Sequence, residues 1–196
     1  MAWFMSGSMT RDGEVVSFLE DRIANQPLNV LVVGNDTRDD LPTDDPYWFG
    51  LFTGQRADVV ILVAFDPDVG EIRLLSLDRD LRVETGEYGP LTIAETFGYG
   101  GSSLLVRSVN QLTDTPVHHY LELSFDGFVY LVDALNGLTV PFCEPSRDRV
   151  TGLRVSSGSV ELDGEGTLAL VRSRAFERLV DGEWVPADQG NAGRVE

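Results

Sequence analysis

Lysine is missing from this chain of 196 residues, so all 15 basic residues are arginines, and 32 acidic residues bring the net charge to −17. A chain this acidic repels nucleic acid and anionic lipid surfaces, so we expect no nucleic-acid partner. Cys143 is the only cysteine, which excludes an internal disulfide. No apolar run approaches the roughly 18 residues of a membrane span, and the N-terminal residues lack the layout of a signal peptide. We therefore expect a soluble protein or a domain of a longer one.

The arginines are informative about anionic ligands. The lack of lysine partly reflects genome bias or adaptation to salt, but this does not explain where the arginines lie. Arginine is always charged, and its planar guanidinium grips pairs of phosphate or carboxylate oxygens, which lysine cannot do. In such an acidic chain, an anionic ligand has to be met by a local arginine cluster, helped by a divalent cation on carboxylates.

The apolar pattern predicts strands interleaved with helices. Residues 28–34 and 58–65 are nearly continuous apolar runs, as expected of strands covered on both faces. The short turn DPDVG between 58–65 and the next apolar run implies an antiparallel hairpin. The full prediction comprises strands at 28–34, 58–65, 71–77, 119–125 and 138–142, helices at 12–26, 102–112, 127–135 and 164–173, and an irregular tail from Asp181.

This alternation predicts the α/β class, with a three-layer α/β/α sandwich around a central mixed β-sheet. The length suits one domain with its own core. We expect residues 1–27 to contribute an N-terminal helix packed on a domain formed by residues 28–196.

Charged residues adjoin the ends of the predicted strands and of the last helix. In open α/β sheets, ligands bind beyond the carboxyl ends of strands, and antiparallel neighbours bring strand ends and strand starts to one rim. Several arginines at one rim would repel one another unless an anion lay between them. The alternative for each arginine alone is a surface ion pair. The residues at the rim, the last helix and the tail are Asp36, Arg38, Arg56, Asp58, Arg79, Arg172, Arg174 and Arg194.

The chain also carries a series of motifs whose order is more specific than any single motif. The motifs are GNDTR, RADVVILV, SLDRDLRV, a long segment from FGYGG to NGLTV, ELDGEGTLALVRSR and a final GR. Over roughly residues 28–194 this order resembles the LytR-CpsA-Psr family. The stretch VPFCEPSRDRVTGLRVSSGSVELDG is most similar to members from actinobacteria.

The resemblance implies an extracytoplasmic, membrane-associated phosphotransferase. Such enzymes transfer a glycopolymer from a polyprenyl pyrophosphate carrier to peptidoglycan, with Mg²⁺ as cofactor. Matched position by position, the catalytic pyrophosphate arginines are Arg56, Arg79, Arg172, Arg174 and Arg194. Arg38, which follows the first predicted strand, is a further candidate for substrate binding. The matching magnesium ligands are Asp36 and Asp58. Candidates for the apolar lipid pocket are Phe97, Leu121 and Phe128, each with ordinary core packing as the alternative.

The sequence departs from the family pattern at internal positions. Thr92-Ile93-Ala94 stands where the family usually has Lys-x-Asn, and Asn191 stands where it usually has an aspartate. An amide cannot act as a carboxylate base. The principal interpretation is a glycopolymer–peptidoglycan phosphotransferase. The alternatives are a degenerate member that binds the lipid-linked polymer or cell-wall glycan without transferring it, and a pyrophosphate hydrolase acting on a soluble substrate.

Overall fold

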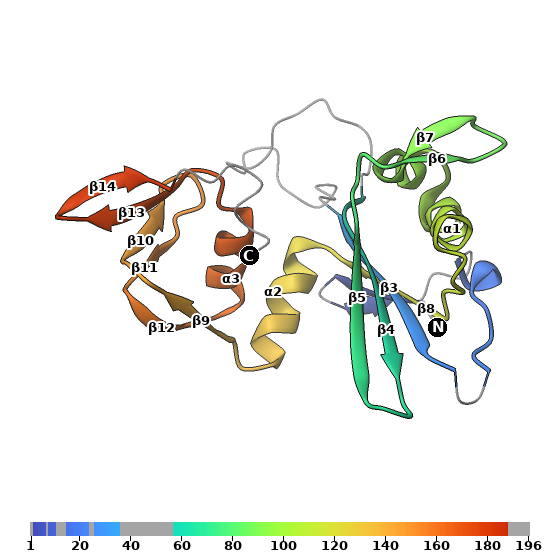
Figure 1. The fold of residues 1–196 in the computed structure, drawn as a ribbon, viewed down its shortest axis with the longest axis horizontal. Coiled ribbons are helices and arrows are strands. Elements are labelled where there is room, and N and C mark those ends of the chain that lie inside the picture. The colour runs from blue at the N-terminus through green and yellow to red at the C-terminus, as the bar shows by residue number, and fades with distance from the viewer. Residues whose placement is uncertain (1, 7, 11–14, 24–25, 36–56, 188–196) are drawn as a thin grey trace. The chain divides into compact units, whose positions relative to one another are not determined.

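The computed structural model describes the chain except for residues 1, 7, 11–14, 24–25, 36–56 and 188–196. The polypeptide forms two compact units, Met1–Gly127 and Phe128–Glu196 (Figure 1). Each unit has its own hydrophobic core. None of the helices in the described part of the chain combines the length and apolar character needed to cross a membrane.

Unit 1 is built on a mixed sheet of six strands. In order across the sheet they are β2 (Ser8–Thr10), β1 (Ala2–Ser6), β8 (His119–Leu123), β3 (Leu28–Asn35), β4 (Ala57–Asp66) and β5 (Glu71–Leu77). The β1–β8 and β8–β3 pairs are parallel, and the others are antiparallel. The predicted hairpin is confirmed as β4–β5, and the predicted α/β class with a central mixed sheet is confirmed.

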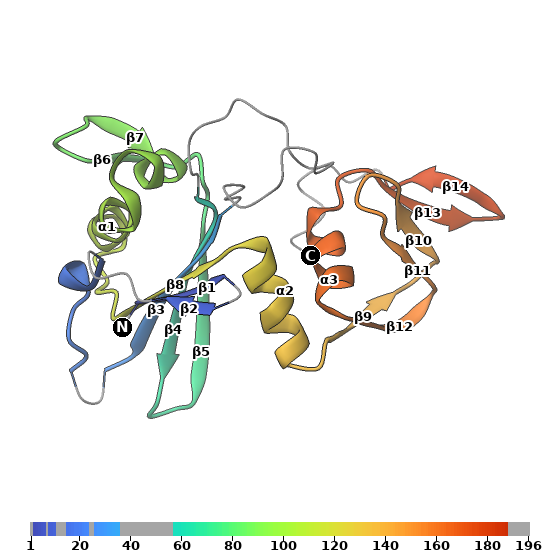
Figure 2. The same cartoon turned by 180° about the vertical axis from the view of Figure 1, so that it is seen from behind.

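The helix α1 (Ile93–Thr113) covers one face of this sheet, as both views show (Figures 1 and 2). Alternate side chains of β3 and β4, among them Leu31 and Leu62, are buried in one core with Leu105 and Val109 of the helix. The short hairpin of β6 (Arg82–Glu84) and β7 (Pro90–Thr92) leads into α1. The helix geometry is interrupted at Gly101, whose φ of 61° suits only glycine without strain.

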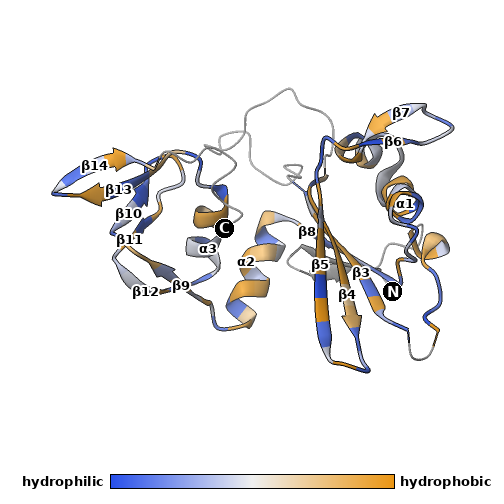
Figure 3. Ribbon diagram, in the orientation of Figure 1, coloured by the Kyte–Doolittle hydropathy of each residue, from blue (hydrophilic) through white to orange (hydrophobic). Residues whose placement is uncertain are grey.

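The opposite face of the sheet, which we call the second sheet face, is also apolar. Side chains alternate between the faces of a strand, so residues between the buried positions of β3 and β4 point to this side. In register across the sheet, Val32 pairs with Ile61, and Val63 pairs with both Val30 and Leu74. Leu74 is 70% exposed. Figure 3 shows the apolar character of β3 and β4 along most of their length.

Unit 2 combines two helices with two small sheets. Its elements are α2 (Phe125–Ala134), which begins in unit 1, β9 (Leu138–Phe142), β10 (Ser146–Asp148), β11 (Arg154–Val155), β12 (Gly158–Leu162), α3 (Gly164–Arg172), β13 (Phe176–Val180) and β14 (Glu183–Pro186). The strand β9 pairs with β12, and a four-stranded sheet runs in the order β11-β10-β13-β14. Cys143 follows β9 with an exposed side chain.

The predicted N-terminal helix is wrong in its extent. The described residues there form only one 3-10 turn, η1 (Val15–Phe18), and residues 19–23 are not helical. The Glu20 N–H donates to the carbonyl of Val117 at 3.0 Å, so this backbone group is bonded to the loop before β8 and not to its own helix. Val15 is buried in the core of unit 1, whereas Ile23 is exposed.

Two further boundaries differ from the prediction. The helix expected at 102–112 begins at Ile93, which precedes the interruption at Gly101. The tail expected to be irregular from Asp181 instead contributes Asp181 and Gly182 to the turn of a hairpin between β13 and β14. Both turn residues have positive φ, which matches the twist of a two-residue hairpin turn.

Candidate functional site

The rim of the sheet in unit 1 brings Arg79 and Asp58 together. Asp58 is the second residue of β4, and Arg79 lies two residues beyond the end of β5. Their side chains form an ion pair with the Arg79 Nη1 atom 2.6 Å from the Asp58 Oδ1 atom. The side chains are 47% and 40% exposed, so solvent and a ligand can both reach the pair. The structure therefore brings these two candidate residues together.

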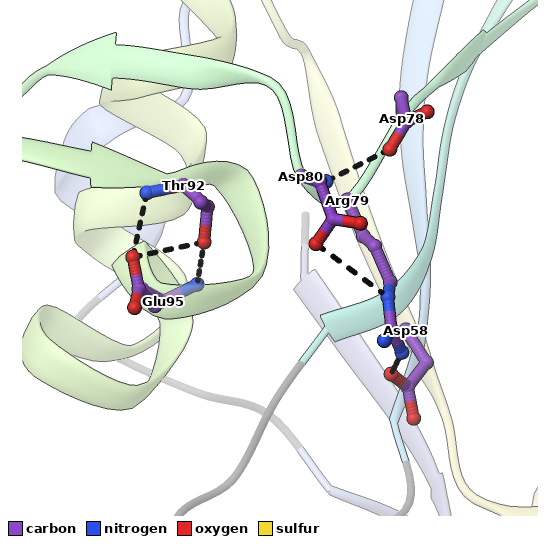
Figure 4. Close-up of polar contacts among 6 residues, drawn as sticks. All are labelled: Asp58, Asp78, Arg79, Asp80, Thr92 and Glu95. Atoms are coloured by element: carbon purple, nitrogen blue, oxygen red, sulfur yellow. Dashed lines mark hydrogen bonds and ion pairs between the residues drawn. The ribbon is translucent and has the colours of Figure 1, made fainter.

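The backbone around Arg79 is fixed on both sides (Figure 4). The Asp78 carboxylate accepts the N–H of Asp80 at 2.8 Å, which tightens the turn that carries Arg79. The carbonyl of Arg79 accepts the N–H of Ala94 at 3.0 Å, and the carbonyl of Leu81 accepts the N–H of Ile93 at 2.9 Å. The turn is thus bonded to the first residues of α1, which limits the positions that the arginine side chain can take.

Thr92 begins α1 as its N-cap. Its hydroxyl accepts the N–H of Glu95 at 3.3 Å, and the Glu95 carboxylate accepts the Thr92 N–H at 2.8 Å (Figure 4). This is a complete capping box, which satisfies two of the unpaired donors of the helix start. The Thr92 and Ala94 departures therefore lie where the Arg79 turn meets α1, and Thr92 has a structural role there.

Arg172 and Arg174 lie at the C-terminal end of α3 in unit 2. Arg172 is the last residue of the helix, and Ser173 leaves the helix with extended backbone angles. The side chain of Arg172 is half-buried, whereas Arg174 is exposed and forms no ion pair with any carboxylate in the described part of unit 2. The helix C-terminus has unpaired carbonyls, which favour cationic side chains nearby.

Four of the predicted site residues, Asp36, Arg38, Arg56 and Arg194, lie outside the described residues. Asn35 pairs with Ala57 where β3 ends and β4 starts. No group of three or more potential metal ligands is present among the described residues. Asp58 supplies a hard carboxylate of the type that Mg²⁺ prefers, and its exposure leaves room for the waters that the ion keeps. The described part of the rim therefore fits one ligand of a magnesium site.

A polar network that the sequence analysis missed lies where β3 and β8 meet. The Asn35 side-chain amide donates to one oxygen of Glu122, and the hydroxyl of Tyr120 donates to the other oxygen at 2.8 Å. Asn35 and Tyr120 are almost completely buried. The alternation of HYLELSF does place Tyr120 and Glu122 on one face, but nothing in the sequence identifies Asn35 as their partner.

The predicted lipid-contacting residues occupy different environments. Phe97 is 4% exposed within the core between α1 and the sheet, so core packing accounts for its apolar character. Leu121 is half-buried on β8, in register with Val32 of the second sheet face. Phe128 is half-buried on α2. Of the three, Leu121 is placed on an apolar surface that α1 does not cover.

Several arginines that are not candidates for the site form ion pairs. Arg147 and Arg149 both pair with Glu177, Arg73 pairs with Glu71, and Arg178 pairs with Glu144. A pair with both side chains exposed, such as Arg73–Glu71, contributes little to stability. These ion pairs also show that ordinary ion pairing accounts for these arginines, in contrast to Arg174.

Comparison with known proteins identifies the family. The model of the LytR_cpsA_psr family matches residues 6–183, which is most of the chain. The chain belongs to the LytR-CpsA-Psr family. It is 34% identical over 151 residues to the probable cell wall biosynthesis protein LcpB of Corynebacterium glutamicum, covering 75% of this chain and 36% of that protein.

Other LytR-CpsA-Psr proteins extend the comparison. The polyisoprenyl-teichoic acid–peptidoglycan teichoic acid transferase TagU of Halalkalibacterium halodurans is 30% identical over 156 residues, covering 79% of this chain and 47% of that protein. The chain thus spans less than half the length of these two relatives. A solved structure of YwtF (TagT) with bound octaprenyl pyrophosphate lipid is 25% identical with a TM-score of 0.61, covering 82% of this chain and 62% of that one.

Proposed function

We propose that this chain is the part of a glycopolymer transferase that binds a polyprenyl pyrophosphate carrier and transfers its polymer to peptidoglycan. The observation that carries this proposal is the exposed Arg79 at the rim of the sheet, fixed by its turn and bonded to Asp58. Phosphoryl transfer needs positioning and charge neutralisation more than covalent help, and an arginine fork supplies both. The relatives named as teichoic acid transferases and the neighbour with bound octaprenyl pyrophosphate support it.

The second sheet face supports an apolar carrier. Leu121, Val32 and Ile61 lie in register across three adjacent strands, and Leu74 extends the apolar surface onto β5. Roughly 25 cal/mol is gained per Å² of apolar surface removed from water, so a polyprenyl chain of many methyl and methylene groups would bind such a surface favourably. A soluble pyrophosphate would gain nothing from it, which favours a lipid substrate over a soluble one.

We further propose that Asp58 contributes to a magnesium site together with Asp36. The ion would neutralise charge on the pyrophosphate oxygens while Arg79 binds others. In the free protein Asp58 is instead neutralised by Arg79 at 2.6 Å. Binding of the metal ion and the pyrophosphate would therefore break this ion pair. This predicts that the protein binds the metal weakly when the lipid is absent. We place this reaction outside the cytoplasm, at the membrane that holds the carrier.

The decisive experiment measures binding of octaprenyl pyrophosphate in detergent by calorimetry. Arg79→Ala should weaken affinity by roughly 1.5–3 kcal/mol, the range for a charged hydrogen bond, which is about 10- to 150-fold in Kd. Arg73→Ala is the matched control, because Arg73 is an exposed, ion-paired arginine on the adjoining strand β5. Equal small effects of both substitutions would mean that Arg79 is only a solvated charge.

A binding module without transfer activity is the second candidate. It is favoured by Thr92, whose hydroxyl is used in the capping box, and by Asn191, which lies outside the described residues. A positioned base typically contributes 10²–10⁴-fold to such a reaction, and an amide cannot supply it. Release of phosphate or transfer of polymer in the presence of Mg²⁺ should therefore be slow and should rise in Asn191→Asp. Equal rates in both proteins would remove this candidate.

A further inference from the structure

Asp148, at the end of β10, has the most buried carboxylate in the described part of the chain. Its exposed fraction is 1%, and no described arginine forms an ion pair with it. Aspartate is almost never fully buried unless its charge is compensated. The family resemblance implies no role for Asp148. In the sequence it lies between Arg147 and Arg149, as an aspartate in an exposed charged segment would. Its burial therefore requires an explanation.

The compensation comes from backbone N–H groups on two separate segments. One oxygen, Oδ1, accepts the N–H of Val150 at 2.8 Å and the N–H of Thr151 at 3.2 Å. The other oxygen, Oδ2, accepts the N–H of Ala175 at 2.8 Å. Burial alone would raise the pKa of Asp148, but hydrogen bonds from Ala175, Val150, Thr151 and Arg174 lower it below the usual range. One carboxylate thus joins the turn after β10 to the segment after α3.

The segment that Asp148 reaches is the one that carries Arg172 and Arg174. Between them, the hydroxyl of Ser173 donates to the carbonyl of Ala169 at 2.8 Å. The same hydroxyl lies 3.1 Å from the hydroxyl of Thr151, which belongs to the turn organised by Asp148. The backbone is therefore held on both sides of Arg174, by Ser173 before it and by the Asp148 bond to Ala175 after it.

A neutral side chain cannot replace this carboxylate. Serine and asparagine have one acceptor oxygen each, so either could support the turn or the arginine segment but not both. In Asp148→Asn, the amide –NH₂ would face an N–H donor on one of the two segments, and two donors cannot form a hydrogen bond. If Asp148 were needed only to form the turn after β10, the hydrogen bond from Ala175 to its second oxygen would have no explanation.

We propose that Asp148 is a positioning residue for pyrophosphate binding, because its buried carboxylate fixes the backbone that presents Arg172 and Arg174. This inference rests on the proposed function, since it assigns these arginines to the pyrophosphate. Asp148 itself does not contact the ligand; it acts through the arginine segment. Residues of one hydrogen-bond network show coupled effects when substituted, which makes the proposal measurable.

The test compares the affinity of four proteins for octaprenyl pyrophosphate in detergent: wild type, Asp148→Asn, Arg174→Ala and the double variant. Asp148→Asn should weaken binding roughly tenfold, within the range of couplings in one network. If Asp148 acts through the arginine segment, the combined loss of affinity in the double variant should be clearly smaller than the product of the two single losses. Independent, multiplying losses would overturn the proposal.

Stability has to be separated from positioning. The matched control is Asp163→Ala, which removes the N-cap of the same helix at the end far from Arg172, where Asp163 accepts the N–H of Gly166 at 2.8 Å. This control should lose stability but keep wild-type affinity when both are measured well below the unfolding transition. A loss of affinity in Asp163→Ala equal to that in Asp148→Asn would reduce Asp148 to a stability residue.

Two further outcomes are distinguishable. If Asp148→Asn does not fold, Thr151→Val removes the contact with the Ser173 hydroxyl more mildly and should still weaken binding; wild-type affinity in that variant would overturn the proposal. Absence of binding by the wild-type protein would overturn the proposed function and this inference with it. Normal binding by Asp148→Asn beside weakened binding by Arg174→Ala would overturn this inference alone.

Discussion

Arg79 and Asp58 form an ion pair across two antiparallel strands, with Nη1 and Oδ1 2.6 Å apart. The pairing follows from the register, because Val60 of β4 pairs with Leu77 of β5, and two residues further out Asp58 and Arg79 are opposite each other. Each residue is the counterion of the other in the free protein. A phosphate that binds Arg79 would have to displace Asp58, and a metal ion that binds Asp58 would have to displace Arg79.

Substitution of Asp58 by Asn should separate metal binding from lipid binding. Without the Asp58 carboxylate, Arg79 keeps only the longer contact with Asp80, whose Oδ1 atom lies 3.8 Å from its Nε atom, so octaprenyl pyrophosphate without Mg²⁺ should bind at least as tightly as to wild type. The additional affinity conferred by Mg²⁺ should disappear. Because the pair is exposed, the free energy of unfolding should change by less than about 1 kcal/mol. Calorimetry with and without Mg²⁺ measures both effects.

Asp66→Asn is the control for this experiment, since Asp66 is at the other end of β4, where it accepts the N–H of Asp68 at 3.0 Å. It should retain the response to Mg²⁺. A wild-type response in Asp58→Asn would exclude Asp58 as a metal ligand.

The stability of the protein should fall in mild acid because of His118. This side chain is buried, and its Nδ1 atom accepts the N–H of Asn29 at 2.9 Å, which requires that nitrogen to be deprotonated. Burial lowers the pKa of His118, Glu20 partly opposes this, and Arg22 adds to it. The unfolded chain therefore binds the proton more tightly, and the free energy of unfolding should decrease as the pH falls below the unfolded value of 6.5.

Denaturant unfolding between pH 7.5 and about 5 measures this dependence. His118→Asn keeps an acceptor near the position of Nδ1 but cannot be protonated, so its stability should vary less with pH. His119→Asn retains His118 and should therefore retain the slope that it causes. An identical slope in His118→Asn and wild type would contradict the assignment.

Gly164 should not tolerate alanine. It begins α3 directly after the N-cap, and a Cβ atom there would lie 2.4 Å from the carbonyl oxygen of Val129 and 2.7 Å from its Cγ1 atom. Overpacking of this kind costs typically 1–3 kcal/mol, and the Gly164 N–H must also keep its 2.7 Å bond to Asp133. Gly164→Ala should lower the free energy of unfolding by about this amount in urea.

Gly166→Ala is the matched control on the same helix. Its Cβ would meet the flexible carboxylate of Asp163 at 3.1 Å, and alanine favours the helix by up to about 1 kcal/mol. Its stability should stay near that of wild type. If Gly164→Ala is equally stable, α2 and α3 are not held together as closely as these contacts indicate.

Arg147 should stabilise the sheet of unit 2 without contributing to the binding of the lipid. Its guanidinium lies 4.0 Å from the centroid of the Trp184 ring, and its Nε atom is 2.6 Å from Glu177. The hydrogen bond from Arg147 lowers the pKa of Glu177. Arg147→Gln should lower the free energy of unfolding by about 0.5–1 kcal/mol for the lost cation–π contact and should change the emission of Trp184.

Arg154→Gln is the control for this substitution, because Arg154 pairs with Arg147 in register but has an exposed side chain. It should leave stability and emission nearly unchanged. Unchanged octaprenyl pyrophosphate affinity in both variants is expected. A large loss of affinity in Arg147→Gln would place Arg147 in the binding site.

The elements that the sequence predicts well are those whose signals are local. Strands β3 and β4 are near-continuous apolar runs, and α3 begins at an Asp-Gly pair whose aspartate is its N-cap. The missed start of α1 had a signal as well, since Thr92 and Glu95 have the spacing of a capping box. The turn at Asp181 and Gly182 was likewise readable as a hairpin signal.

The remaining features depend on contacts between distant residues. The N-terminal segment has helical spacing, yet Glu20 is bonded to Val117, which no local pattern predicts. Similarly, Arg79 and Asp58 could be placed together because a short hairpin joins their strands, whereas the link from Asp148 to Ala175 spans two sheet strands and a helix. Local charge pattern cannot distinguish a buried aspartate from a solvated one.

The exposed Cys143 makes unit 2 directly accessible to spectroscopy. It is the only thiol of the chain, and the chain has no lysine side chain to compete for less selective reagents. A maleimide dye or spin label would therefore modify one known position beside β9, in the unit that carries Arg172 and Arg174. Changes in the fluorescence or spin-label spectrum on ligand binding could be followed in the unmutated sequence. With a second cysteine introduced into unit 1, a pair of labels would measure the distance between the two units.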